Sequence, residues 1–521
     1  MAEEQQFFSR EAKMFKIQLD NIANDFQNLP RFSPKLYDPL VNFLRVPLEN
    51  YTPFLYTIEI LFTKLLKRGD LVEDIIPLKP IDESPEAEYT RWLRQCYEMA
   101  LSRTLELIKH GRTNSRLQAL VTACKLLQVE GKHPLEPTQG YYFPSVRLKN
   151  IFTVLLDSDV SMSPVILRFQ EFTEYRDVQQ YGLKVLAAIA YRKSPSTTYM
   201  LNFLELLEKL LLTEIATEPK GKIKDKEDYE EENWKLLCST DSGKRFPYSQ
   251  ASCRRYANRC WGFACQWPLY AEARTHRRAL LLLVERVLPL LTRPHLATDM
   301  LCDSLDAGGA ISMVALQGVL ELVRRHNVDY PDIYDRLYAM YEPEMFVTRH
   351  KDRLMKLTDI FLSSTHLPES LVAAFAKRLS RLALVASCED ATRLLQLVGN
   401  MLQRHPGLKR MVCAEESHAV MSSDGYVMEE TSAARSRALG GSLWEVAALR
   451  KHSHRGVSAA AAQVLSAAHA RAPLNIVALN DDALFEEELQ RRFNSIEVNF
   501  IRPSLAIQQP NNRFTSFWKP I

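Results

Sequence analysis

Apolar residues recur with the spacing of an α-helix along most of the chain, most regularly between Gly308 and His405. A first stripe has apolar or small residues three and four positions apart, which places them on one helical face. The stripe consists of Ile311, Val314, Ala315, Gly318, Val319 and Leu322. Pro331 and Pro368 each stand where a further helix can begin, because the first turn of a helix leaves its N–H groups unpaired anyway. The pattern predicts a stack of helical hairpins.

Two more helices of this stretch have start and stop signals of their own. Thr348 is placed to cap the next helix, and Ser363 to Thr365 interrupt the helical pattern after it. Pro406 ends the last helix of the stretch. The two helices should bury Leu354, Leu357, Ile360 and Phe361, and then Leu371, Phe375, Leu379 and Leu382.

The chain before Thr217 also reads as helix after helix, with prolines between the periodic segments. The predicted spans are 8–29, 34–45, 54–67, 84–110, 114–129, 164–192 and 197–216. No sequence repeat of fixed length is visible. Antiparallel helix pairs every forty or so residues nevertheless predict an all-α, HEAT-like helical-repeat solenoid.

A run of four lysines and six acids between Lys220 and Glu232 interrupts this pattern. We interpret it as a solvated linker; a docking segment whose basic and acidic halves meet different partners is the alternative. The predicted domains are a helical-repeat region (1–218), the charged linker (219–243), a helical domain (244–470) and a carboxy-terminal docking tail (471–521).

Within the helical domain, residues 413–437 are polar and read as a surface loop. Gly440 and Gly441 then precede a helix with Leu443 and Trp444, and an alanine-rich helix follows at 457–468. In the tail, Asp481 and Asp482 are placed to cap a short charged helix.

Composition restricts the cellular setting. The net charge is only +3 over 521 residues, so any contact with nucleic acid must come from a local patch. The first residues, MAEEQQFF, are acidic and predict no secretory signal, and the longest apolar run (279–291) is too short to cross a membrane. Nine cysteines predict free thiols in the cytosol or nucleus.

The most basic window runs from Lys244 to Arg278, with eight Lys or Arg residues against the single acid Glu272. Aromatic residues are interleaved with them, and RNA binding combines cations for phosphates with rings for unpaired bases. The predicted RNA contacts are Arg254, Arg255, Arg259, Arg274, Arg277 and Arg278. The alternative is that the aromatic residues of the window, Trp261, Phe263 and Trp267, belong to the core.

A second set of cations flanks the apolar stripes of the central helices. A helical groove carrying such residues can hold an acidic partner helix or an RNA backbone, and a solvated cationic face is the alternative. The predicted partner-binding residues are Arg324, Arg325, Lys377, Arg378 and Arg381.

Catalytic and metal chemistry find no support in the sequence. No phosphate-binding glycine loop or dinucleotide motif is present. Cys253, Cys260 and Cys265 are spaced seven and five residues apart, unlike the short paired spacings of zinc sites. His366, in the sequence SSTHLP, is interpreted as a residue of a helix entry. We therefore predict no enzyme, no cofactor, no metal and no small-molecule substrate.

The central helices carry a family resemblance. HNVDYPDIYDRLY, FLSSTHLP and LVAAFAKRLSRLAL resemble the signature of the CCAAT-binding-factor-type domain of nucleolar complex proteins. SLWE followed by HSHRGV is most similar to the nucleolar complex protein 4 family. The similarity is dense from about residue 261 to 468. Residues 413–437 and the chain after 473 depart from the pattern.

The resemblance implies a non-catalytic factor of small-subunit ribosome assembly. Such a protein is expected in the nucleolus, in a complex with nucleolar protein 14 and other proteins of the small-subunit processome, with pre-ribosomal RNA as a further contact left open. Two alternatives are a nuclear transport or general adaptor solenoid and a sequence-reading DNA-binding regulator. The low net charge and the lack of a DNA-reading module weigh against the regulator.

Overall fold

The computed structural model describes most residues between Pro34 and Ser466. The described residues are 17–18, 20–21, 34–44, 46–48, 51–72, 84–136, 140–190, 195–211, 235–239, 246–269, 272–326, 330, 332–412, 424–466, 486 and 489–490. Every regular element among them is a helix, which confirms the all-α prediction. The charge run at 220–232, most of the helix predicted at 8–29 and nearly all of the predicted tail lie outside these residues.

The chain divides into two compact units, Met1–Val328 and Asp329–Ile521. Residues on both sides of the charge run therefore belong to the first unit. The domain boundaries expected from the sequence stay a prediction. In the first unit the α-helices are α2 (Tyr37–Leu44), α3 (Leu55–Arg68), α4 (Pro85–His110), α5 (Thr113–Lys132), α6 (Ser145–Leu156), α7 (Ser163–Phe169), α8 (Arg176–Ile189), α9 (Thr197–Leu210), α10 (Gln250–Ala264), α11 (Ala273–Leu282), α12 (Thr298–Asp306) and α13 (Gly309–His326).

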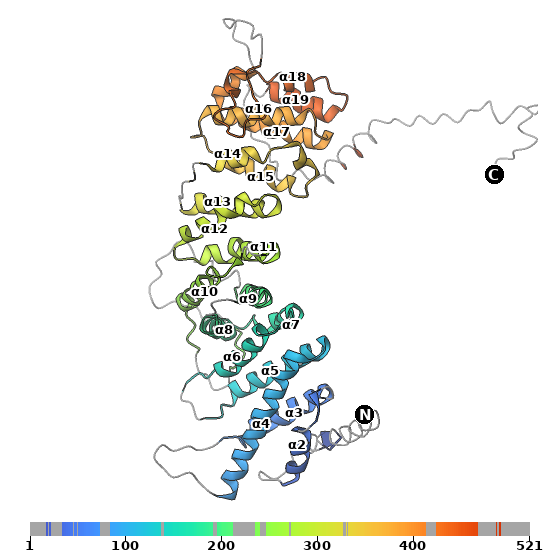
Figure 1. Cartoon of the computed structure of the whole chain (residues 1–521), viewed down its shortest axis with the longest axis vertical. Coiled ribbons are helices and arrows are strands. Elements are labelled where there is room, and N and C mark those ends of the chain that lie inside the picture. The colour runs from blue at the N-terminus through green and yellow to red at the C-terminus, as the bar shows by residue number, and fades with distance from the viewer. Residues whose placement is uncertain are drawn as a thin grey trace, which may run out of the picture. The chain divides into compact units, whose positions relative to one another are not determined.

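All of these helices except α12 form two rows (Figure 1). In one row α2, α4, α6, α8 and α10 pack each against the next, and in the other row α3, α5, α7, α9, α11 and α13 do the same. Successive helices such as α4 and α5 pack across the two rows. Since each helix contacts its neighbours in the stack, the unit is the helical-repeat solenoid that the periodicity predicts.

Local signals explain where the helices of the first unit begin. The Ser84 hydroxyl accepts the backbone N–H of Ala87 at 3.2 Å and caps α4, whose first residue is a proline. Glu86 and Glu88 in the first turn oppose the positive end of the α4 dipole. Ser196 caps α9 in the same way through the N–H of Tyr199.

A short segment after the charge run, which we call the return segment (Lys235–Ser239), packs on this solenoid. Its Leu237 and Cys238 donate their backbone N–H groups to the buried carboxylate of Asp177 in α8, at 3.0 Å each. The N–H of Arg176 donates in turn to the carbonyl of Lys235. The Cys238 side chain lies against Gly131 of α5, where a Cβ would overlap the Cys238 Sγ.

The structure corrects three helix predictions in the first unit. The helix expected at 164–192 is two helices, α7 and α8, with a turn between them. The Gln179 side chain donates to the carbonyl of Thr173 at 2.8 Å, which satisfies a backbone group of this turn. Helix α6 was not predicted, although Leu148, Ile151 and Phe152 lie on its buried face. The other described spans agree to within a few residues, except that α9 ends at Leu210 instead of residue 216.

The second unit is built around two long buried helices, α16 and α17. Helix α17 packs on α16, on α15 and on α19, and α18 packs on α19. Ser387 caps α17 by accepting the N–H of Asp390 at 3.2 Å. The α-helices of this unit are α14 (Ile333–Ala339), α15 (Lys351–Phe361), α16 (Glu369–Ala383), α17 (Cys388–Arg404), α18 (Trp444–Leu449) and α19 (Arg455–Ser466).

Sequence reasoning placed these helices well but misassigned three of their residues. Thr348 does not cap α15, because its hydroxyl donates to the Met345 carbonyl and the helix begins at Lys351. Ile360 is exposed rather than buried. Leu371 is only half-buried, and its neighbour Val372 occupies the core instead.

Candidate interaction surfaces

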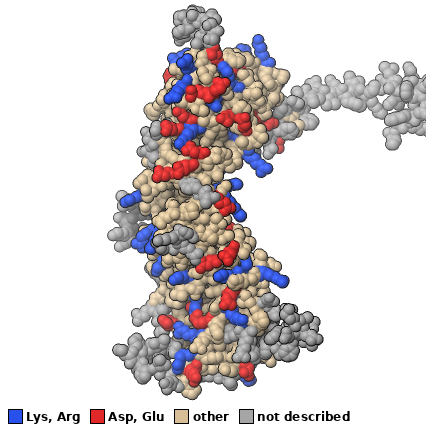
Figure 2. Space-filling view, in the orientation of Figure 1, with Lys and Arg blue, Asp and Glu red and all other residues tan. Residues whose placement is uncertain are grey.

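Positive and negative side chains are interspersed on the face drawn in Figure 2. No single-sign region dominates that face, in keeping with the net charge of +3. On this face, recognition by charge would have to use small local groups of residues.

Lys377 in α16 is fully buried, which corrects the expectation of an exposed flank. Its ammonium group lies 2.9 Å from a carboxylate oxygen of the equally buried Glu445 in α18 and 2.8 Å from Asp424. It also donates to the Ser442 carbonyl at 2.5 Å. A buried ammonium is tolerated only when its donors are satisfied in this way.

Arg381, one turn further along α16, shares both acids with Lys377. It donates to Glu445 and to Asp424, each at 2.8 Å. We call Lys377, Arg381, Asp424 and Glu445 the α16 charge network. Its two cations and two acids balance, so the network holds the loop at Asp424 and helix α18 on α16 without a net charge.

The pKa values of the network follow from these contacts. Burial alone would raise the pKa of the Asp424 carboxyl, but hydrogen bonds from Lys377, Trp444 and Arg381 outweigh burial and lower it to about 2. Burial alone would lower the pKa of the Arg381 guanidinium, but its hydrogen bonds to Glu445 and Asp424 raise it. Both groups are therefore held in their charged forms.

Arg378 is the second buried cation of α16, with 5% of its surface exposed. Its guanidinium lies 4.5 Å from the ring centre of Tyr338. It donates to the carbonyl of Tyr341 at 2.7 Å and to the carbonyls of Met428 and Glu430. Arg378 therefore holds the residues after Asp424 in place and cannot also line an exposed rim.

In the predicted partner-binding set, Arg324 and Arg325 are exposed and Arg381 is partly exposed. Arg324 and Arg325 lie exposed at the end of α13 in the first unit, and Arg325 pairs with Glu321. In the second unit, Arg381 keeps 28% of its side chain exposed. Its guanidinium lies 5.5 Å from the ring of Trp444, a residue that is itself 45% exposed.

The sequence analysis did not identify Asp424 and Glu445, the acids of the α16 charge network, or the neighbouring ring of Trp444. A usable signal was present at Glu445, which stands between the apolar Leu443 and Val446 at the start of a helix. An acid on a buried helical face requires a cationic partner, and Lys377 is such a partner.

The predicted RNA contacts of α10 divide into one residue bonded within the fold and two exposed residues. Arg254 donates to the carbonyl of Leu290 at 3.0 Å. Arg255 and Arg259 are exposed, and each lies over an aromatic ring of its own helix. The two tryptophans of the window, Trp261 and Trp267, are 4% exposed each, which confirms the core interpretation for them.

The other three predicted RNA contacts meet in one cleft of about 270 Å³, which we call the α11 cleft. Its walls come from α9, from α11 and from the start of α7, three successive helices of one row of the first unit. The lining residues are Ser161, Ser163, Leu201, Glu205, Arg274, Arg277, Arg278 and Leu281. Arg278 pairs with Glu208 at 2.6 Å, and Ser163 donates to Glu205 at 2.6 Å. Arg274 and Arg277 are exposed.

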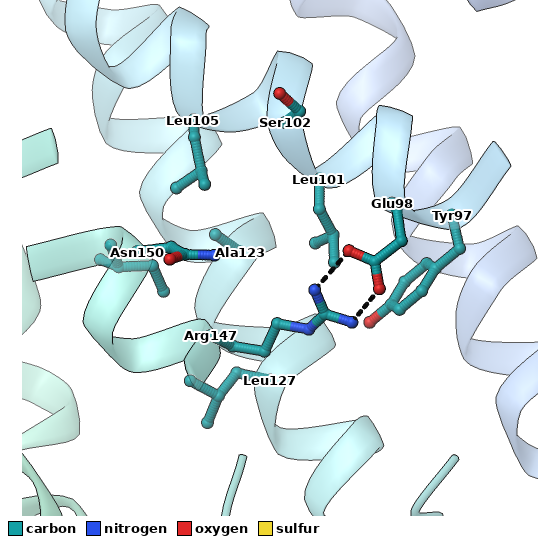
Figure 3. Close-up of a pocket in the computed structure, with 10 residues that line it drawn as sticks. Tyr97, Glu98, Leu101, Ser102, Leu105, Ala123, Leu127, Arg147 and Asn150 are labelled. Carbon is teal, nitrogen blue, oxygen red and sulfur yellow. Dashed lines mark hydrogen bonds and ion pairs between the residues drawn. The ribbon is translucent and has the colours of Figure 1, made fainter. Parts of the chain in front are cut away.

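A smaller cavity of about 130 Å³ lies between α4, α5 and α6 (Figure 3). Arg147 of α6 fills its polar side and pairs with Glu98, as the dashed lines show. Its Nε also donates to the buried Glu130 at 3.0 Å, and Tyr97 donates to the same carboxylate at 2.9 Å. These charged and hydroxyl groups satisfy one another's hydrogen bonds. We therefore interpret the polar side of the cavity as an ion-pair network that joins neighbouring repeats.

The cysteines and the histidine considered for catalysis or metal binding are not grouped into a reactive or metal-binding site within the described residues. Burial raises the pKa of the Cys253 thiol to about 11 and that of the Cys260 thiol to about 12, which keeps both protonated at neutral pH, whereas Cys265 is exposed. Within the described part of the chain, no three His, Cys, Asp or Glu residues are grouped to hold a metal ion. His366 is exposed. None of the described helices is long and apolar enough to cross a bilayer.

Comparison with known proteins gives matches in both halves of the chain. The family described as CBF/Mak21 matches residues 312–461. The family described as nucleolar complex protein 4-like, TPR repeats, matches residues 52–195. The second match covers helices α3 to α8, and the first includes the whole α16 charge network. Neither description names an enzyme.

Full-length relatives are similar over most of their sequence. The chain is 32% identical over 458 residues to nucleolar complex protein 4 homolog B of Xenopus laevis, which covers 84% of each chain. It is 32% identical over 475 residues to the homolog of Rattus norvegicus, covering 88% of this chain and 89% of the other. To the homolog of Homo sapiens it is 31% identical over 449 residues, covering 83% and 84%.

Proposed function

Because the chain belongs to the nucleolar complex protein 4 family, we propose that it is a non-catalytic assembly factor of the small ribosomal subunit. Membership in this family makes it a nucleolar protein with a role in ribosome biogenesis. In our proposal it forms a stable complex with nucleolar protein 14 inside the small-subunit processome and supports pre-ribosomal RNA processing there.

The observation that carries this proposal is that one family match, residues 52–195, lies in the first unit and the other, residues 312–461, lies mostly in the second. Stacked helices give such a protein long, continuous surfaces, which suit an extended or helical segment of a partner. Buried ion pairs such as Lys377 with Glu445 fix the second unit internally. A preformed surface loses little conformational freedom when a partner binds.

Exposed cations would contribute orientation and association rate rather than most of the affinity. Arg324 and Arg325 are exposed and Arg381 is partly exposed, and these three residues keep this role in the proposal. Lys377 and Arg378 would act on the partner only indirectly, by holding the second unit in shape.

Co-expression of the full chain with nucleolar protein 14, followed by size-exclusion chromatography, tests the proposal. We expect one co-eluting complex. Arg324→Ala combined with Arg325→Ala should slow association and weaken its salt dependence without abolishing the complex. A matched control, Arg112→Ala with Arg293→Ala, removes two exposed arginines of the same unit and should bind as the wild type does. Separate elution of the two full-length proteins would refute the partnership.

A nuclear transport or general adaptor role is the competing function. Affinity purification of the full chain from nuclear extract separates it from the proposal. Assembly factors and pre-ribosomal RNA should co-purify if the proposal is right. A transport receptor with its cargo in their place would favour the adaptor.

A further inference from the structure

The α11 cleft concentrates positive charge that the described residues do not neutralise. Three arginines and one acid, Glu205, line it. Glu208 engages Arg278, and Glu205 lies 3.8 Å from the same guanidinium. Arg274 and Arg277 have no ion-pair partner among the described residues, so two exposed guanidinium groups face one small cleft.

This arrangement costs stability unless an anion occupies the cleft. Arg274 lies three and four positions from the other two arginines of α11, so all three share one helical face. Like charges at these spacings repel each other. By contrast, Arg147, Arg381 and Arg404 are each paired with an acid.

The lining suits the oxygens of a phosphate group. Guanidinium groups match phosphate geometry with two parallel hydrogen bonds, and serine hydroxyls are common phosphate and sugar contacts. Ser161 and Ser163, at the start of α7, also line the cleft, and the Ser163 hydroxyl already donates to Glu205. None of the described residues that line the cleft is aromatic, so these residues offer no ring on which a base could stack.

We propose that the α11 cleft binds phosphates of an RNA backbone, without reading the base sequence. Arg274 and Arg277 contact the phosphates directly. Arg278, tied to Glu208, is a positioning residue that holds the cleft wall. The choice of RNA as the polyanion rests on the proposed role in ribosome assembly, whereas the cleft itself rests only on its geometry.

Binding of the full chain to single-stranded RNA oligonucleotides of several unrelated sequences tests the cleft. Arg274→Ala with Arg277→Ala should weaken the affinity about tenfold, equally for every sequence. The slope of log affinity against log salt should become shallower by about 1.4, because each phosphate contact on a single strand contributes about 0.7. The control pair Arg112→Ala with Arg293→Ala removes the same charge elsewhere in the unit and should have a much smaller effect on affinity.

Three results would overturn the inference. One is an unchanged affinity and salt slope in the cleft variant. Another is a loss confined to Arg255→Ala with Arg259→Ala, which would place RNA on α10. The third is tighter binding of a polyglutamate peptide than of RNA at equal charge, which would assign the cleft to an acidic protein segment. Complex formation with nucleolar protein 14 is measured separately, so failure of either proposal can be told from failure of the other.

Discussion

The carboxylate of Asp177 accepts the backbone N–H of Cys238 at 3.0 Å, across 61 residues of sequence. The same carboxylate accepts the N–H of Leu237 and, at 2.5 Å, the hydroxyl of Tyr141. One buried acid of α8 thus holds the return segment and the residues before α6 together.

Asp177→Asn should loosen the return segment. The asparagine amide has one oxygen acceptor where aspartate has two, and its NH₂ group would face backbone N–H groups that are also donors. We therefore expect the variant to lose about 3 kcal/mol of unfolding free energy. Hydrogen exchange at Leu237 and Cys238 reports this locally and should speed up. Asp159→Asn, at an exposed position, is the control and should leave exchange there unchanged. Wild-type protection in the Asp177 variant would contradict the role given to this carboxylate.

Gly131→Ala should destabilise the first unit although it replaces glycine in a helix. Alanine normally stabilises a helix interior by about 0.5–1 kcal/mol relative to glycine. Here the new Cβ would overlap Cys238 Sγ and lie 2.6 Å from its Cβ, so we expect a net loss of about 1–3 kcal/mol in urea unfolding. Gly262→Ala in α10 meets nothing within 4 Å and should be stabilising. Cys238→Gly should restore part of the loss, and no recovery would argue against the clash.

Lys377→Met should destabilise the second unit by about 3 kcal/mol, because it leaves the buried Glu445 with Arg381 as its remaining cation. Glu445→Met alone should cost a similar amount. The double variant should be more stable than the sum of the single changes predicts, since buried ion pairs are often replaceable by apolar side chains. Urea unfolding of all four proteins gives the coupling free energy. Lys451→Ala, an exposed lysine, should change stability by less than about 0.5 kcal/mol.

The Asp424 carboxyl should make the second unit sensitive to acid. Its folded-state pKa of about 2 lies below the ordinary 3.8, so the ionised form stabilises the fold above about pH 4. This contribution, about 2 kcal/mol, is lost as the pH falls from about 4 to 2. Asp424→Asn should therefore be less stable than wild type at neutral pH, and the gap should close by about pH 2. Urea midpoints measured across this range check the prediction, and a constant gap would contradict it.

The helices that sequence periodicity locates best are those with both an apolar stripe and a capping signal. Helix α4 was expected at 84–110 and observed at Pro85–His110, with Ser84 as its cap. Helices α7 and α8 were merged because the turn between them depends on a side-chain bond from Gln179 to Thr173. That hydrogen bond cannot be seen in the spacing of apolar residues, because it supplies a partner for a backbone carbonyl without changing the apolar pattern.

The candidate surfaces were harder to predict than the helices. A lysine beside an apolar stripe looks the same in sequence whether it snorkels to water or is buried. Lys377 is buried because Glu445, 68 residues later, lies within 3.0 Å of it. By contrast, the arginines of α11 meet in one cleft partly because their own spacing places them on one helical face. The spacing of the α11 arginines therefore predicted that they share a surface, whereas the burial of Lys377 depends on a partner far away in the sequence.

The charge run lies between Leu211 and Lys235. Both of these residues belong to described parts of the first unit. A protease cut anywhere between them would therefore yield two fragments that stay associated, held by Asp177 and by the packing of α8 on α10. The same two fragments, expressed separately, should reassemble into one solenoid.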